Sequence, residues 1–379
     1  MTPEPSSATT GGPTSASTET TASSPSPTSS VARTCGSSVA AAMSRDEQAG
    51  QLLMVGLDAN AGQASLDELI ERYHLGGVIL LGGWSGRAKV TAATGHLNAL
   101  TANDSPRLLV AADQEGGQVQ QLRGEGFATI PSARQQDGMT PDQLQAAAKG
   151  WASQLADAGI NVNLAPVADT VPASLGRGNG PIGRWDRQFS ADPAENARMV
   201  GGFIAGMHAG GVAATIKHFP GIGRISSNTD FSGAGITDGV TSADDSYLTP
   251  FAVGIRAKTD LVMVSTAIYS KLDPGVNAIF STAIVTHLLR GGLGWSGVTI
   301  TDDVGAAKAV ASVPVGDRAT GFIGAGGDIV LTAQPGDIPT MHAAIVAAAA
   351  TDPTFAAKVT AATARVIDLK VGRGLARCS

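Results

Sequence analysis

Short runs of apolar residues alternate with amphipathic stretches along most of this chain. Eight apolar runs can be recognised, over residues 51–57, 77–81, 108–113, 162–169, 213–219, 261–269, 298–303 and 328–331. Several of them are apolar at consecutive positions, which is typical of parallel strands that are buried on both faces. The pattern therefore predicts eight buried strands.

The segments between these runs carry helical periodicity and helix-start signals. Amphipathic stretches cover residues 65–73, 141–158, 193–209, 243–257 and 282–290. Thr140 and Asp192 are each followed by proline, which is the pattern of an N-cap before a helix-compatible first turn. Glycine pairs at 210–211 and 291–292 predict helix ends.

Strands that alternate with helices predict an α/β fold, and eight such repeats favour a single-domain (β/α)8 barrel of the TIM type over residues 35–379. An open doubly wound sheet is the alternative. That fold would need a glycine-rich phosphate-binding turn after an early strand, and the sequence has neither this turn nor a P-loop. We therefore expect the barrel.

The first 34 residues have a different composition. They contain nine Ser, nine Thr and five Pro, which leaves few side chains able to form a core. We predict a disordered, Ser/Thr/Pro-rich stalk that holds the folded domain off a surface, although a low-complexity tail without a role is an alternative. No signal peptide or lipid anchor is recognisable in this sequence.

Cys35 and Cys378 are the two cysteines of the chain, and they lie at opposite ends of the predicted domain. Neither belongs to an apolar periodic segment, so packing explains them poorly. We predict a disulfide between them, with two free thiols as the alternative. A disulfide requires an oxidising compartment, so we expect a secreted or envelope-attached protein.

Charge and hydropathy exclude some classes of function. The net charge is -6 and the sequence pI is about 5.5, which argues against a nucleic-acid-binding protein. The sequence has no apolar run that approaches the roughly 18 residues of a membrane span. We expect a monomer whose contact with the cell envelope, if it has one, is peripheral and made through the stalk.

Polar residues gather where the predicted strands end. Asp113 ends the third strand, Asp169 the fourth, Lys217 and His218 lie on the fifth, and Asp302 ends the seventh. The carboxyl ends of barrel strands meet at one mouth, which is where TIM barrels hold their active sites. A cluster of carboxylates with a Lys-His pair suits binding and chemistry on a polyhydroxylated ligand.

Other chemistries lack their sequence patterns. No HExxH or comparable ligand spacing supports a metal site, no GxSxG elbow supports serine hydrolysis, and no phosphate turn supports a nicotinamide cofactor. Carboxylate-based glycosyl transfer remains, and it needs a nucleophile and an acid on opposite sides of a sugar. We expect neither a metal nor a cofactor.

The strand-end segments resemble glycoside hydrolase family 3, in particular its bacterial β-N-acetylglucosaminidase branch. Residues 217–221, Lys-His-Phe-Pro-Gly, resemble the KHFPGHG motif, and residues 301–304, Thr-Asp-Asp-Val, resemble the SDDL nucleophile motif. Residues 113–120 are similar to DQEGGRVQR, residues 164–169 to the FAPVLDV strand, and residues 187–193 to the R-S-Y-x-A-D-P turn. These matches follow one another in order over roughly residues 50–335, which makes them specific together.

The resemblance implies a role for each matching residue. Asp302 matches the nucleophile, with a helix cap as its alternative role, while the adjacent Asp303 is expected to be a structural cap. Asp113 matches a carboxylate that binds sugar hydroxyls, with a turn-forming role as the alternative. Three further residues match donors that contact the sugar, namely Arg187, Lys217 and His218.

Asp169 also matches the family pattern, and two roles are open to it. The resemblance places it among the residues that bind substrate. A buried Lys217 satisfied by Asp169 is the alternative, in which case the carboxylate would act as a partner alone.

The chain departs from the family pattern in the loop that carries the general acid/base. The branch uses an Asp-x-His pair there, and the corresponding positions hold Asn228 and Asp230. A carboxylic acid can protonate a leaving oxygen when burial raises its pKa, so Asp230 is the acid candidate and Asn228 is expected to orient the loop. A turn-forming role for Asp230 is the alternative, and three other aspartates of the region could compete as the acid, namely Asp238, Asp244 and Asp245.

The chain differs from the family pattern at four further positions. Ile222 stands in place of a His, Gln118 and Gln121 in place of two arginines, and Thr266 in place of a His.

Together these features predict a retaining exo-β-N-acetylglucosaminidase that releases N-acetylglucosamine from peptidoglycan fragments by double displacement. Its partner is a carbohydrate substrate, and the second acceptor is either water or phosphate. Another family 3 β-glycosidase, such as a β-glucosidase, is an alternative. A catalytically silent sugar-binding protein is a second alternative, because the Asp-x-His pair is missing.

Overall fold

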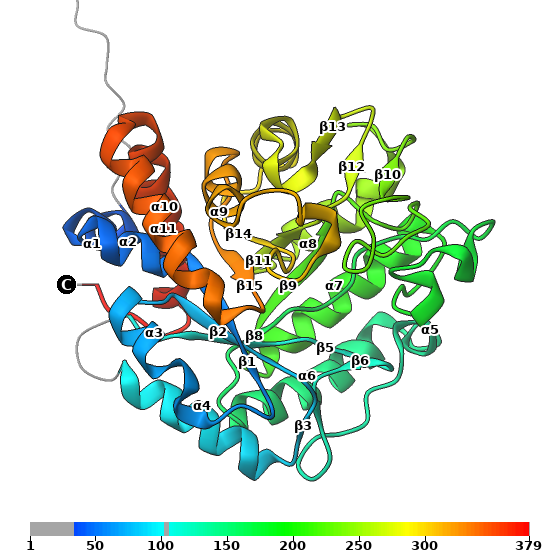
Figure 1. Cartoon of the computed structure of the whole chain (residues 1–379). Coiled ribbons are helices and arrows are strands. Elements are labelled where there is room, and N and C mark those ends of the chain that lie inside the picture. Colours follow the sequence, from blue (N-terminus) through cyan, green and yellow to red (C-terminus); the bar gives the residue numbers. More distant parts are fainter. Residues whose placement is uncertain (1–33, 102–105, 379) are drawn as a thin grey trace, which may run out of the picture. The chain divides into compact units, whose positions relative to one another are not determined.

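A computed structural model describes residues 34–101 and 106–378, and its centre is an eight-stranded sheet (Figure 1). The strands are β1 (Leu53–Asp58), β2 (Gly77–Leu81), β4 (Leu109–Ala112), β8 (Val162–Asn163), β9 (Ala213–Phe219), β11 (Leu261–Val264), β14 (Val298–Thr301) and β15 (Val330–Thr332). Neighbours pair in parallel in this order, and β15 lies against β1. A parallel bridge between Ile300 and Ile329 nearly closes the ring, so the predicted barrel is confirmed.

Helices surround the strands, as Figure 1 shows. They are α1 (Cys35–Ala42), α2 (Arg45–Gln51), α3 (Asp67–Tyr73), α4 (Arg87–Leu100), α5 (Ala133–Gln136), α6 (Pro141–Asp157), α7 (Pro193–Ala209), α8 (Thr249–Arg256), a π-helix over Ala283–Gly292, α9 (Val315–Gly324), α10 (Ile338–Thr351) and α11 (Pro353–Gly372). None of the helices in the described part of the chain is long and apolar enough to cross a membrane.

Two of these helices begin at the predicted caps. Thr140 Oγ1 accepts a hydrogen bond from Gln143 N at 3.2 Å, and Asp192 Oδ1 accepts one from Ala194 N at 2.8 Å. Each cap satisfies an amide that has no partner inside its helix. The starts of α6 and α7 therefore follow from local sequence.

Other predicted elements differ from the structure. The fourth apolar run pairs as a regular strand only over Val162–Asn163, because Pro166 has no N–H to donate to a ladder. The chain still reaches the barrel mouth, since Val167 bridges Lys217.

The run over 261–269 divides into β11 and β12 (Ile268–Tyr269), and β12 belongs to a small sheet with β10 (Thr237–Asp238) and β13 (Asp273–Asn277). The helix-like stretch over 243–257 is a regular α-helix only from Thr249, and the π-helix continues through the glycine pair 291–292.

The short strands β3 (Trp84–Ser85), β5 (Gln114–Gly116), β6 (Val119–Gln120) and β7 (Leu122–Arg123) form two small sheets in the connections after β2 and β4. They shape the loops that follow those strands. The first small sheet pairs β3 with β7, and the second pairs β5 with β6.

The predicted disulfide is confirmed. Cys35 and Cys378 are bonded, with their Cα atoms 5.5 Å apart, and the bridge joins the start of α1 to the segment after α11. Gly36 N donates to Asp368 Oδ1 at 2.7 Å, which adds a second link between the same two helices. The predicted stalk lies outside the described residues, except for Thr34, which caps α1.

Removing the disulfide should lower stability. A crosslink that closes 343 residues restricts the unfolded chain by roughly 5 kcal/mol at most. We expect the double substitution Cys35→Ser/Cys378→Ser to lower the Tm by about 5 to 10 °C, measured by calorimetry. Reduction of the native chain should give the same Tm as the double variant, and an unchanged Tm in both cases would contradict the prediction.

Candidate active site

One cavity at the carboxyl ends of the barrel strands collects most of the predicted site residues. Its volume is about 380 Å³. The lining includes five of the charged residues that the sequence pointed to and the matching His. These are Asp113, Arg187, Lys217, His218, Asp230 and Asp302.

Asp302 follows β14 directly and enters the cavity wall because its amide is fixed to Val264 O of β11 at 3.1 Å. Asp303 makes different contacts. Its Oδ1 accepts hydrogen bonds from Gly305 N at 2.8 Å and from Ala333 N at 2.9 Å. Asp303 thus holds the loop after β14, as expected of a structural cap, although it also lines the cavity. Asp302 Oδ1 accepts from Asp303 N at 3.0 Å, which leaves Oδ2 of Asp302 to face a ligand.

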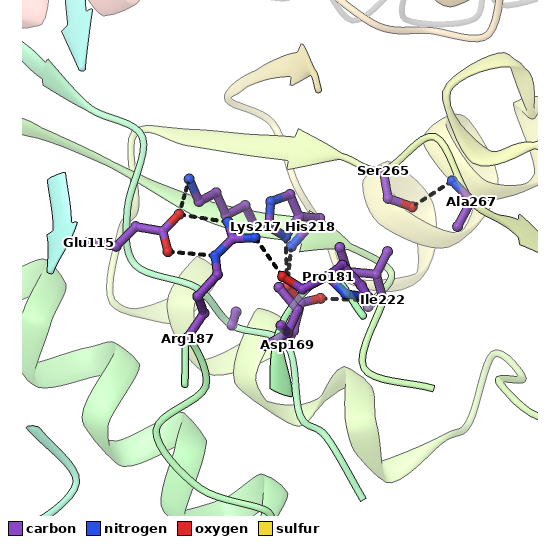
Figure 2. A network of polar contacts seen from close by, with 12 residues as sticks. Glu115, Asp169, Pro181, Arg187, Lys217, His218, Ile222, Ser265 and Ala267 are labelled. Atoms are coloured by element: carbon purple, nitrogen blue, oxygen red, sulfur yellow. Dashed lines mark hydrogen bonds and ion pairs between the residues drawn. The ribbon is translucent and has the colours of Figure 1, made fainter. Parts of the chain in front are cut away.

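Lys217 and Arg187 are held by two carboxylates (Figure 2). Lys217 Nζ lies 2.5 Å from Asp113 Oδ1 and 2.6 Å from Glu115 Oε1, and Arg187 binds Glu115 through two hydrogen bonds of 2.8 Å. Burial alone would raise the pKa of Glu115, but the two cations outweigh burial and hold that pKa at about 2. Burial would lower the pKa of Lys217, but Asp113 and Glu115 raise it above its ordinary value. Glu115 is therefore ionised at neutral pH, and Lys217 and Arg187 are fixed, charged donors.

His218 is oriented by Asp169. The ring Nδ1 lies 2.7 Å from Asp169 Oδ2, and the other carboxylate oxygen accepts from Ile222 N at 2.7 Å (Figure 2). A carboxylate on Nδ1 makes that nitrogen the donor, which leaves Nε2 for a ligand. Asp169 itself is fully buried and is absent from the cavity lining, so the structure places it behind His218 and not against the substrate.

The alternative role of Lys217, a buried ion pair with Asp169, is wrong. Lys217 pairs with Asp113 and Glu115, whereas Asp169 pairs with His218. Asp113 keeps 20% of its side chain exposed while it holds Lys217, and it also lines the cavity. Asp113 can therefore bind the lysine and a sugar hydroxyl at the same time.

Asp230 lies in the loop after β9 and is fixed by both its neighbours and a distant segment. Its amide donates to Asn228 Oδ1 at 2.9 Å, and its carbonyl accepts from Lys308 N at 3.2 Å. The loop is thus tied to the segment that follows the Asp302 strand. Asn228 has the loop-orienting contact that we expected of it.

The electrostatics of Asp230 suit a proton donor. Desolvation by the surrounding protein, together with repulsion from Asp302, raises the pKa of Asp230 to about 6, although the residue as a whole is exposed. The competing carboxylates do not line the cavity. Asp238 accepts from Val240 N and Thr241 N, Asp244 binds Ser242, and Asp245 binds Arg224.

Sequence reasoning missed two residues. Glu115 holds both Arg187 and Lys217, and its signal was present, because it stands inside the matching segment 113–120. Asn179 carried no signal, since a lone Asn in a glycine-rich stretch is usually a turn residue. It is fully buried, and its side chain donates to Ile222 O and Ile225 O and accepts from Ile182 N and Gly183 N, all at 2.8 Å.

Metal binding has no support in the described residues, where no group of three or more His, Cys, Asp or Glu side chains is placed to hold an ion. The absence of a cofactor stays a prediction from sequence.

A family model described as the glycosyl hydrolase family 3 N-terminal domain matches residues 44–369. The chain belongs to glycoside hydrolase family 3. Among family 3 relatives, a β-hexosaminidase of Xanthomonas oryzae is 33% identical over 293 residues, which are 75% of this chain and 84% of the relative.

Solved structures of family 3 enzymes are also similar. A β-N-acetylhexosaminidase from Beutenbergia cavernae superposes with a TM-score of 0.84 and 45% identity, covering 87% of this chain and 99% of that one. A family 3 β-N-acetylglucosaminidase from Paenibacillus has a TM-score of 0.75 and 26% identity, covering 88% of this chain and 63% of that one. The family resemblance of the strand-end motifs is therefore confirmed.

Proposed function

We propose that this glycoside hydrolase is a retaining exo-β-N-acetylglucosaminidase that releases N-acetylglucosamine from peptidoglycan fragments by double displacement. The observation that carries the proposal is the placing of Asp302 and Asp230 in one cavity, with the pKa of Asp230 raised to about 6. Such a pair places a carboxyl group with a raised pKa beside a second carboxyl group in the same site, which suits a mechanism that needs an acid and a nucleophile. The choice of an amino sugar rests on relatives named as β-hexosaminidases.

In the first step, an Asp302 oxygen bonds to the anomeric carbon while the bond from that carbon to the leaving oxygen breaks. Protonated Asp230 gives its proton to the leaving oxygen. The products are a covalent glycosyl-enzyme and the free aglycone, with Asp230 now ionised.

In the second step, the Asp230 carboxylate removes a proton from water as the water oxygen attacks the anomeric carbon. The ester bond to Asp302 breaks, and the configuration of the sugar is retained. Asp230 is protonated again at the end of the cycle.

The remaining cavity residues support sugar binding. Asp113 accepts hydrogen bonds from hydroxyls, Lys217 and Arg187 donate to ring substituents, and His218 Nε2 accepts from a hydroxyl. The ion pairs behind these donors fix them before the substrate arrives, which lowers the entropy that binding must overcome.

The proposal includes an oxidising location. The Cys35–Cys378 bond supports a secreted or envelope-attached protein, because such bonds persist outside the reducing cytosol. We further propose a monomer that meets the envelope through the Ser/Thr/Pro-rich segment, residues 1–34.

An assay with two aryl glycosides tests the activity. We expect turnover of aryl β-N-acetylglucosaminide and at least 100-fold slower turnover of aryl β-glucoside. The reverse preference would support a β-glucosidase, and binding of N-acetylglucosamine without turnover would support a silent sugar-binding protein. Repeating the assay with and without phosphate identifies the second acceptor, since a glycosyl phosphate forms only if phosphate attacks the glycosyl-enzyme.

A further inference from the structure

A recess adjoins the catalytic cavity and shares part of its lining. Its volume is about 370 Å³, and it shares Trp185, Asn228 and Phe231 with the cavity lining. Arg184, Ser226 and Ser227 also line it. We call it the Arg184 recess. Because Asp230 lies between Asn228 and Phe231 in the sequence, the recess is on the side of the cavity where the acid protonates the leaving oxygen.

The two walls of the recess are fixed to each other. One wall is the segment that contains Arg184 and Trp185, and the other is the loop after β9. The buried Asn179 side chain accepts from Ile182 N and Gly183 N on the first wall and donates to Ile222 O and Ile225 O on the second. Gly180 N also donates to Ser226 O at 3.2 Å. A recess held in this way exists before a ligand arrives.

The chemistry of the lining selects one kind of occupant. Among its lining residues in the described part of the chain, Arg184 is the one charged side chain. Its guanidinium lies over the Trp185 ring, 5.7 Å from the ring centre, and it is exposed. Phe231 is 78% exposed, so an apolar ring face is open to a ligand. Aromatic rings, hydroxyls and one cation together match a sugar that carries a carboxylate.

A second hollow also includes Trp185 but does not offer the same chemistry, because a carboxylate lines it together with a cation. The two are Asp186, which pairs with Arg177 at 2.9 Å, and Arg134, which donates to Phe189 O at 3.2 Å. In the recess that is lined by the acid-bearing loop, Arg184 is the charged side chain.

We propose that the Arg184 recess is the aglycone subsite and that Arg184 selects a leaving sugar bearing a carboxylate. This inference rests on the proposed function and names the residues that decide its aglycone. The sugar ring packs against Trp185 and Phe231, its hydroxyls contact Ser226 and Ser227, and its carboxylate pairs with the guanidinium. A charge-assisted pair of this kind is directional, and salt weakens it when it is exposed.

The test uses two disaccharides that differ in one charge. Both carry β-1,4-linked N-acetylglucosamine on N-acetylmuramic acid, one with a free lactyl carboxylate and the other as its methyl ester. We expect the native enzyme to favour the acid over the ester by about tenfold in kcat/KM, and Arg184→Gln to bring this ratio close to one. The matched control is Arg177→Gln, because Arg177 is exposed on the same segment, pairs with Asp186 and does not line the recess.

Equal acid-to-ester ratios in the native enzyme and Arg184→Gln would overturn the proposal, even with full activity on aryl N-acetylglucosaminide. Failure of the aryl substrate would instead refute the proposed function. In that case the recess is still tested by binding. Calorimetry gives the dissociation constants of the acid and the ester, and their ratio should differ between the native enzyme and Arg184→Gln.

The contribution of the Phe231 ring to the recess can be tested separately. Phe231→Ala should lower kcat/KM several-fold for the acid and the ester alike, because ring packing does not depend on the charge. Val240→Ala is the matched control, since Val240 is the other exposed large apolar side chain of the described residues, at 53%. An unchanged rate in Phe231→Ala would remove this residue from the subsite.

Discussion

Asp302→Asn should abolish turnover of aryl β-N-acetylglucosaminide, with a loss on the order of 10⁴-fold in kcat. An amide oxygen is a poor nucleophile, and no glycosyl ester can form on it. The cavity should remain able to bind N-acetylglucosamine, because the donors Lys217 and Arg187 are held by Asp113 and Glu115 and not by Asp302.

The neighbouring aspartate provides the control for this substitution. Asp303 Oδ1 accepts from Gly305 N and Ala333 N, so Asp303→Ala, which removes this acceptor, should lower the Tm more than Asp302→Asn does. A 5-fluoro derivative of N-acetylglucosamine, followed by peptide mapping, should label Asp302. Label on Asp303, or hydrolysis by Asp302→Asn at the native rate, would refute the proposed nucleophile.

Asp230→Ala should separate substrates by their leaving groups. Natural disaccharides need a proton on the departing oxygen, so we expect kcat/KM on them to fall by about 10² to 10⁴-fold. Aryl glycosides with an acidic phenol need little help, and their first step should lose less than about tenfold. Loss of the base in the second step should make the glycosyl-enzyme accumulate, which appears as a burst of phenol. Added azide should speed its breakdown by attacking the anomeric carbon in place of water.

The same residue predicts the pH dependence. Asp230 must be protonated in the free enzyme, and its pKa is raised to about 6. The protonated fraction falls above that pH, so kcat/KM on natural disaccharides should decrease about tenfold per pH unit on the alkaline side. Asp230→Ala should lack this decrease on the same disaccharides.

A carboxylate from the same region is the control for both measurements. Asp244 binds Ser242 and does not line the cavity, so Asp244→Ala should keep the native rates and pH profile. Equal losses on aryl and natural substrates in Asp230→Ala would assign the acid to another residue.

The sequence predicted a large part of the fold because its signals are local. Consecutive apolar residues marked all eight barrel strands, and Thr140 and Asp192 marked two helix starts. It did not predict where the fourth run leaves the ladder at Asn163, or that Ile268 joins a separate sheet. Pairing of a strand depends on partners that are distant in the chain, and an apolar run gives no sign of them.

The residues of the candidate site were likewise predicted only in part from the sequence. The strand-end rule and the family motifs found Asp113, Lys217, His218 and Asp302 from sequence, because the residue types and their positions are enough for that inference. The position of Asp169 behind His218 had to come from the structure, since burial is set by everything that packs around a residue.

By itself, the amino-acid sequence determined the barrel, the cysteine pair and the residues that gather at the barrel mouth. Each of these follows from local patterns and the geometry of parallel strands. Only the tertiary structure decided their charges and partners. Glu115 meets Arg187 from 72 positions away, and Asp302, equally distant in sequence from Asp230, raises the pKa of that acid. Electrostatic interactions depend on separation in space, and folding alone brings such groups together.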